Sequence, residues 1–171
     1  MQNLFTGIEK ASKRFESNWE KPGKYIERIE KISVIQDRNR KTKIIINKTV
    51  IKVLDSAEGK GHIAGEEIGH MIDTHNDAFL PTVKTIICNI MGATPDEVTN
   101  EVCNAWCGVE PPGNNPWAGW FVLCENIQRP TKQGGVFTNI NYRKRITVSE
   151  LRQPEILSAQ DIERFGIPEK D

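Results

Sequence analysis

Cysteine and histidine side chains gather in the middle of the 171-residue sequence, where they could bind a metal. Cys103 and Cys107 have the i, i+4 spacing of one helix face, and two thiolates with two imidazoles would make a tetrahedral zinc set. The other candidates are Cys88, Cys124, His62, His70 and His75, with Asp73 and Asp77 close by. Their spacing matches no zinc knuckle, and a His-Glu-x-x-His motif is absent. The pattern favours reduced thiols packed as small apolar residues, so we expect no metal, no other cofactor and no catalytic residue.

Basic residues gather in two polar segments that could hold a polyanion. The first, around residues 36–43, contains Arg38, Arg40, Lys41 and Lys43. The second, around residues 129–135, contains Arg129 and Lys132, and its glycine pair permits a tight, mobile tip. Phosphate groups need cations, and a flexible loop lets cations follow a backbone without reading its sequence. Together the two segments predict contacts with a nucleic-acid backbone.

The formal net charge is zero, with 23 basic and 23 acidic residues, but the charges are unevenly distributed. Residues 1–60 carry 14 Lys and Arg against eight Asp and Glu, and residues 126–152 carry six against one. Residues 61–125 carry one Lys against nine acidic residues, and residues 153–171 carry two basic residues against five acidic ones. A local field depends on nearby charges rather than on the total, so neutrality does not exclude a nucleic-acid partner.

The composition is that of one globular domain, since 37% of the residues are hydrophobic and 27% are charged. The longest apolar runs are far shorter than the ~20 residues that a membrane span needs, so we expect no membrane contact. The first residues have neither a basic nor an apolar signal region. These features predict a cytoplasmic protein.

The local patterns predict a mainly β chain with helical insertions. We expect strands over 24–35, 42–54, 62–68, 117–128 and 136–148, because β-branched and aromatic residues alternate with polar ones there. The apolar phase slips within the first strand, which indicates a bulge or sharp curvature. Helices are expected over about 6–15, 77–91, 95–107 and 158–165, from capping boxes and i, i+3, i+4 apolar spacing.

Three strands, a helical connection and two further strands match the five-stranded Greek-key barrel of the OB-fold. The expected domain is 1–152, with the barrel at about 22–151, followed by an acidic C-terminal segment, 153–171, with a short helix. An OB-fold binds oligonucleotides on its strand 2–3 face and with the loops joining strands 1–2 and 4–5. Those two loops coincide with the two basic segments.

The fifth strand adds an aromatic residue and further cations on one phase, where a base could stack and phosphates could be neutralised. The residues expected to contact nucleic acid are Arg38, Arg40, Lys41, Lys43, Lys48, Arg129, Lys132, Phe137, Asn141, Arg143 and Arg145. Trp120 and Tyr142 are weaker candidates for stacking, because both are also expected in the core.

Five stretches resemble a known family: 61–67 (GHIAGEE), 70–71 (HM), 74–80 (THNDAFL), 91–98 (MGATPDEV) and 131–143 (TKQGGVFTNINYR). They are similar to the small single-stranded-DNA-binding-like proteins of tailed bacteriophages, over roughly residues 22–151. The resemblance implies an OB-fold, sequence-independent binding of single strands and a role in phage DNA replication or recombination, in the host cytoplasm. In that family an acidic C-terminal tail commonly recruits replication or recombination proteins. The acidic residues at 161–171 are interrupted here by Arg164 and Lys170.

Two other functions remain open from the sequence. One is a non-catalytic protein-interaction module on an OB-like barrel, with the acidic block 61–125 as its docking face. The other is a metal-dependent enzyme built from the histidines, acids and cysteines named above, although the motifs of such enzymes are absent. A homo-oligomer is compatible with any of these functions. We therefore expect a non-enzymatic protein whose main partner is single-stranded DNA.

Overall fold

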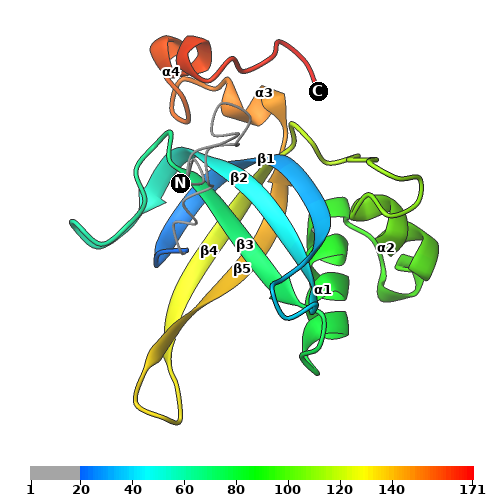
Figure 1. Cartoon of the computed structure of the whole chain (residues 1–171). Coiled ribbons are helices and arrows are strands. Elements are labelled where there is room, and N and C mark those ends of the chain that lie inside the picture. Colours follow the sequence, from blue (N-terminus) through cyan, green and yellow to red (C-terminus); the bar gives the residue numbers. More distant parts are fainter. Residues whose placement is uncertain (1–19) are drawn as a thin grey trace, which may run out of the picture.

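Five antiparallel strands form the centre of the protein, a computed structural model of which describes residues 20–171 (Figure 1). The strands are β1 (Gly23–Gln36), β2 (Thr42–Asp55), β3 (Glu67–Asp73), β4 (Phe121–Pro130) and β5 (Val136–Ile146). The helices are α1 (Phe79–Met91), the short 3-10 helix η2 (Pro95–Glu97), α2 (Asn100–Trp106), α3 (Val148–Leu151) and α4 (Ala159–Arg164). The helix expected over residues 6–15 lies outside the described residues. No described helix is both long and apolar enough to span a bilayer.

The sheet is open, because its order β3-β2-β1-β4-β5 leaves β3 and β5 as edge strands. Every pairing is antiparallel, so β3 and β5 both run in the direction of β1. A closed barrel needs a ladder between β3 and β5, and residues 20–171 form none. The mainly β, five-stranded architecture is confirmed, whereas the expected closure of the barrel is wrong.

The phase slip of the first strand corresponds to irregular pairing between β1 and β2. The register shifts at Lys24/Tyr25, at Ile26/Glu27 and at Ile29/Lys31. An extra residue in one strand bends that strand and increases its twist. Figure 1 shows β1 curving so that it follows β2 along its length, while only its first residues, up to Arg28, pair with β4. The predicted curvature is confirmed.

The third strand begins later than the sequence pattern predicts. It was expected around residues 62–68, but β3 starts at Glu67 and continues to Asp73. Gly65 has a φ of 91°, which strand residues do not adopt, so the chain turns there before pairing begins. His62, in the preceding turn, is buried and packs edge-on against Tyr25 with ring centroids 5.1 Å apart.

The helical connection is divided into more pieces than expected. α1 ends where predicted, at Gly92, whose φ of 66° is the left-handed conformation common after helices. Thr94 and Glu97 form the predicted capping box, but the helix that they cap is only η2. α2 then begins separately after Thr99, whose hydroxyl accepts a hydrogen bond from the Val102 amide. A threonine thus caps η2 and another caps α2, whereas α1 begins after Ala78 without a side-chain cap.

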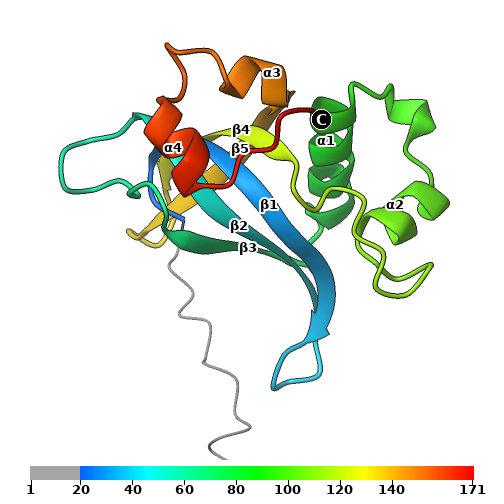
Figure 2. The same ribbon diagram turned by 90° about the horizontal axis from the view of Figure 1, so that it is seen from above.

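Apolar side chains pack on both faces of the sheet, and Figure 2 shows α1 and α2 on a different side from α3 and α4. One core joins the sheet to α1 and α2, and includes Ile29, Ile46, Ile87, Trp106 and Trp117. The other joins the opposite face to the C-terminal segment, and includes Ile26, Ile51, Phe121, Ile146, Leu151, Leu157 and Ile167. Residues 153–171 are thus packed against the sheet rather than extended from it.

Three tryptophans lie together at the edge of the first core. The rings of Trp106 and Trp117 meet edge to face with centroids 5.7 Å apart, and those of Trp117 and Trp120 stack at 5.6 Å. The Arg145 guanidinium lies over the Trp120 ring, 3.8 Å from its centroid. The cluster fastens the start of β4 and the end of β5 to the helical connection.

Candidate functional site

A groove runs along the edge of β5 that has no strand partner. Its wider part, a cavity of about 430 Å³, lies between β5 and β3 and is lined by residues such as Met71 and Phe137. Its narrower part, about 260 Å³, lies between β5 and α1. Ile140 lines both cavities, so the two parts adjoin. The open sheet order creates this groove, because β3 and α1 face the β5 edge without pairing with it.

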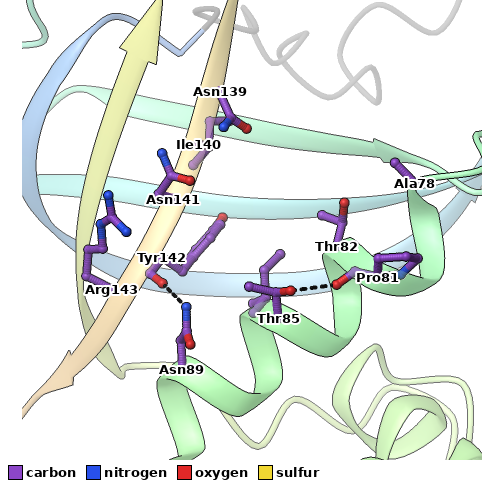
Figure 3. Close-up of a pocket in the computed structure, with 11 residues that line it drawn as sticks. Ala78, Pro81, Thr82, Thr85, Asn89, Asn139, Ile140, Asn141, Tyr142 and Arg143 are labelled. Carbon is purple, nitrogen blue, oxygen red and sulfur yellow. Dashed lines mark hydrogen bonds between the residues drawn. The ribbon is translucent and has the colours of Figure 1, made fainter. Parts of the chain in front are cut away.

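Polar side chains from α1 and β5 surround the narrower cavity (Figure 3). The Asn89 amide donates to the Tyr142 carbonyl at 2.9 Å, and the Thr85 hydroxyl donates to the Pro81 carbonyl at 2.7 Å. The Asn139 carboxamide and the Thr82 hydroxyl also line the cavity. Neither of these two groups has a hydrogen-bond partner among the described residues.

A buried ion cluster lies beside the wider cavity, which Glu20 lines. The Lys48 Nζ is 2.6 Å from the Glu20 Oε1 and 2.5 Å from the Glu27 Oε2. The Asn126 amide donates to the other oxygen of Glu20 at 2.8 Å. The side chains of Lys48 and Glu27 are 0% exposed and that of Glu20 is 4% exposed. The cluster places three ionisable groups in the interior of the protein.

The opposite charges of Glu20 and Lys48 stabilise each other in the interior. Burial alone would raise the pKa of Glu20, but attraction to Lys48 and the contacts with His62 and Lys48 lower it to about 2. Burial raises the pKa of Glu27, and Lys48 opposes this only in part. Burial would lower the pKa of Lys48, but the two carboxylates raise it well above its ordinary value. Lys48 is therefore protonated and paired with two acidic side chains inside the protein.

His70 lies beside this cluster and is uncharged at neutral pH. Its Nδ1 is 3.1 Å from the Tyr142 hydroxyl, and the two rings stack with centroids 5.7 Å apart. Burial, together with the positive charge of Lys48, lowers the pKa of His70 to about 3, although Glu20 opposes the shift. The His70–Tyr142 contact joins β3 to β5 through side chains, where a closed barrel would have a backbone ladder.

Replacing His70 with asparagine is expected to weaken the acid sensitivity of the fold. Because the pKa of His70 is lower in the folded than in the unfolded chain, the unfolded chain binds the proton first as the pH falls. The free energy of unfolding should thus decrease as the pH falls below about 6.5. Urea unfolding at pH 7, 6 and 5 should show a flatter dependence in His70→Asn. The matched control is His75→Asn at an exposed position, and an equal flattening there would contradict the assignment.

Lys48 was expected to contact nucleic acid at the surface. Its ammonium is instead buried between two carboxyl groups. Tyr142 is 2% exposed and packs on His70, so its ring is not available for stacking. The ring of Trp120 is half-buried and is already engaged, since it stacks on Trp117 and contacts the Arg145 guanidinium. These three expectations fail because each side chain lies in the protein interior or between other side chains.

Three further predicted cations are near the surface but have acidic partners. Lys43 lies 3.7 Å from Asp37 and 3.8 Å from Asp73. Arg143 pairs with Glu125 at 2.6 Å, and Arg145 with Asp171 at 3.4 Å. The Asn141 amide, in turn, donates to the Glu125 carbonyl at 3.1 Å while lining the narrower cavity. A phosphate would have to compete with these carboxylates.

The five remaining predicted cations are exposed, and no described acidic side chain forms an ion pair with them: Arg38, Arg40, Lys41, Arg129 and Lys132. The first three lie in the β1–β2 turn, and the last two lie at the end of β4 and in the β4–β5 turn. Because β4 pairs only with the beginning of β1, the two turns lie beyond opposite ends of that strand. A nucleic acid that touched both turns would have to cross the sheet.

Phe137 is 49% exposed at the start of β5 and lines the wider cavity. It pairs directly with Arg129 in the β4–β5 ladder. Directly paired residues of antiparallel strands have their side chains on the same face. The hairpin therefore presents, side by side, an aromatic ring and a guanidinium that forms no ion pair within residues 20–171, and Figure 1 shows the hairpin projecting from the body of the protein.

Sequence reasoning missed several residues of the groove. Asn139 shares the phase of Phe137 and Asn141, so the alternation of residues along β5 could have identified Asn139 as a site residue. Glu20 and Thr82 had no such signal, because only the fold brings them to the cavities. Met71 lies in β3 but outside the strand expected over residues 62–68, so the sequence pattern did not indicate it.

The residues considered for a metal site are used otherwise. Within residues 20–171, no three His, Cys, Asp or Glu side chains gather as a metal would require. His62 accepts a hydrogen bond from the Lys21 amide at 2.9 Å, and its Nδ1 lies 3.0 Å from Glu66. Cys107 and Cys124 are buried thiols, and burial raises the pKa of Cys124 well above its ordinary value.

Comparison of the chain with protein-family models and with curated proteins gives no match.

Proposed function

We propose that this protein binds single-stranded DNA without catalysing a reaction. The observation that carries the proposal is the exposed pair of Phe137 and Arg129 on the β4–β5 hairpin. A base can stack on the ring while the guanidinium neutralises a neighbouring phosphate, and stacking of this kind tolerates any sequence. Lys132 at the hairpin tip and the cations of the β1–β2 turn would extend the contact along the backbone.

We further propose that the sheet is a variant of the OB-fold in which a groove replaces the β3–β5 ladder. The strand order and the position of α1 between β3 and β4 support this assignment. The resemblance to phage single-stranded-DNA-binding-like proteins suggests a role in DNA replication or recombination, within the host cytoplasm. In this proposal, replication or recombination proteins would contact the packed C-terminal segment.

The proposal is tested by the salt dependence of binding to fluorescein-labelled oligo-dT, measured by anisotropy. The logarithm of the association constant should fall by ~0.7 per log unit of salt for each neutralised phosphate. The double variant Arg129→Ala/Lys132→Ala should reduce this slope by about 1.4, because it removes two phosphate contacts. Lys24→Ala/Lys60→Ala, which removes two exposed lysines elsewhere, is the matched control. Wild-type affinity that does not change between low and physiological salt would contradict the proposal.

The two unpaired strand edges favour a second candidate, a protein-interaction module. β3 and β5 present backbone donors and acceptors that an extended segment of another protein could pair with. The acidic block 61–125 contributes β3 and α1 to the walls of the groove. A partner that co-purifies in stoichiometric amount, together with no shift of single-stranded DNA in a gel, would favour this candidate over DNA binding.

A further inference from the structure

The narrower cavity contains more hydrogen-bonding groups than the protein itself uses. The Asn139 carboxamide and the Thr82 hydroxyl have no partner among the described residues, and the Oδ1 of Asn141 is also unused there. Figure 3 shows Asn139 and Asn141 on β5 and Thr82 across from them on α1. Donors and acceptors from two elements thus converge on one space of about 260 Å³.

The remaining lining combines apolar side chains with one charged side chain and with polar groups already bonded within the protein. Pro81, Ile86 and Ile140 provide flat, apolar surface, and Arg143 is the only ionisable side chain among the lining residues with a formal charge at neutral pH. Glu125 binds two of the guanidinium nitrogens of Arg143, Nε at 2.8 Å and Nη2 at 2.6 Å. The Nη1 has no described partner and can donate a hydrogen bond to one oxygen of a phosphate. Apolar walls with a few convergent polar groups are typical of small-molecule binding sites.

We propose that this cavity holds one unstacked base of the bound strand and prefers adenine. The inference rests on the proposed binding of single-stranded DNA and adds a base-reading site to it. A carboxamide offers an adjacent donor and acceptor, which match the N6 amino group and N7 of adenine. Bases of single strands can also be bonded on their Watson–Crick edge, where adenine presents the same amino group beside N1. Adenine therefore offers a carboxamide two matching edges.

The position of the cavity agrees with this assignment. Phe137 lies at the hairpin end of the groove and Asn139, Asn141 and Arg143 follow it along the same strand. A DNA single strand that stacks its first base on Phe137 and continues along β5 reaches the cavity without crossing the sheet. Phe137 then supplies affinity that is independent of sequence, and the cavity supplies the preference.

The test compares wild-type protein with Asn139→Ala and Thr82→Val for binding to oligo-dA, oligo-dT, oligo-dC and a fully abasic oligonucleotide of equal length. Stacking within each free oligonucleotide is the same for all proteins, so it cancels when variants are compared. The expected result is a loss of at least about fivefold for oligo-dA in each variant, from the lost hydrogen bonds. Affinity for the abasic oligonucleotide should not change. Asn47→Ala, at a half-buried asparagine of β2 outside the cavity, is the matched control.

Three outcomes overturn the inference. Equal losses for all oligonucleotides, the abasic one included, would show that the variants act on the backbone contact or the fold. A loss in Asn47→Ala, with none in Asn139→Ala or Thr82→Val, would place the base on the β2–β3 face instead. Both results leave the proposed DNA binding intact, whereas failure of the wild-type protein to bind any oligonucleotide overturns the proposed function as well.

Discussion

Replacing Lys48 with methionine is expected to lower the free energy of unfolding by about 3–5 kcal/mol, the cost typical of removing one partner of a buried ion pair. The change leaves the carboxylates of Glu20 and Glu27 buried beside each other without a cation. Since small proteins are stable by only about 5–15 kcal/mol, this is a large part of the total. Urea unfolding followed by circular dichroism at pH 7 measures the difference.

The neighbouring carboxylates provide the decisive comparison for Lys48→Met. Adding Glu20→Gln and Glu27→Gln removes the uncompensated charges, so the triple variant should recover most of the lost free energy. Lys31→Met, at an exposed lysine of β1, is the matched control and should change stability by about 0.5 kcal/mol or less. A loss below 1 kcal/mol in Lys48→Met would show that Lys48 is not the buried cation of this cluster.

Replacing Phe137 with alanine is expected to weaken binding of oligo-dT by about 1–3 kcal/mol, or roughly 5- to 150-fold, from the loss of one stacked base. Because the change removes no charge, the slope of affinity against salt should stay that of the wild type. This separates Phe137→Ala from Arg129→Ala, which should lower both the affinity and the slope. Fluorescence anisotropy of a labelled oligonucleotide at three salt concentrations measures both quantities.

Two further variants make the result for Phe137 specific. Val136→Ala changes the preceding residue, which is 67% exposed, and should leave binding unchanged because a valine offers no stacking surface. Phe137→Trp keeps an aromatic face and should retain the affinity. If Phe137→Ala binds within twofold of the wild type, the hairpin is not the stacking site, and the proposal loses the observation that carries it.

The sequence predicts the hairpins and helix ends well, because these depend on local chemistry. The β1–β2 turn coincides with a polar segment and the β4–β5 turn with a polar segment that contains two glycines, and Gly92 and Thr94 mark a helix end and a cap. The position of β3 depends on pairing with β2 rather than on local alternation, so the predicted range of this strand lies several residues too early in the sequence. Closure of the sheet depends on the relation of β3 to β5, which no local pattern encodes.

The fate of the charged candidates illustrates the same limit. Lys48 shares its phase with Ile44, Ile46 and Val50, all buried, which was a signal that its side chain points inward. Its partner Glu20 belongs to a segment with no strand pattern, so the ion cluster could not be predicted from alternation. Arg145 is paired with Asp171, at the other end of the C-terminal segment, and only the packing of that segment reveals the contact.

The tryptophan cluster has a consequence for spectroscopy. Trp106 and Trp117 are each 2% exposed. Trp120 contacts Trp117 and Arg145, and Arg145 lies near the end of β5 whereas Phe137 lies near its start. Emission from these three indoles depends on the packing of α2 against β4, so it should change when the protein unfolds. A base stacked on Phe137 leaves their surroundings unaltered. The chain has a fourth tryptophan, Trp19, outside the described residues, so the cluster is observed alone in a Trp19→Phe variant. Intrinsic emission of that variant reports the integrity of the fold, and a label on the oligonucleotide reports occupancy of the groove.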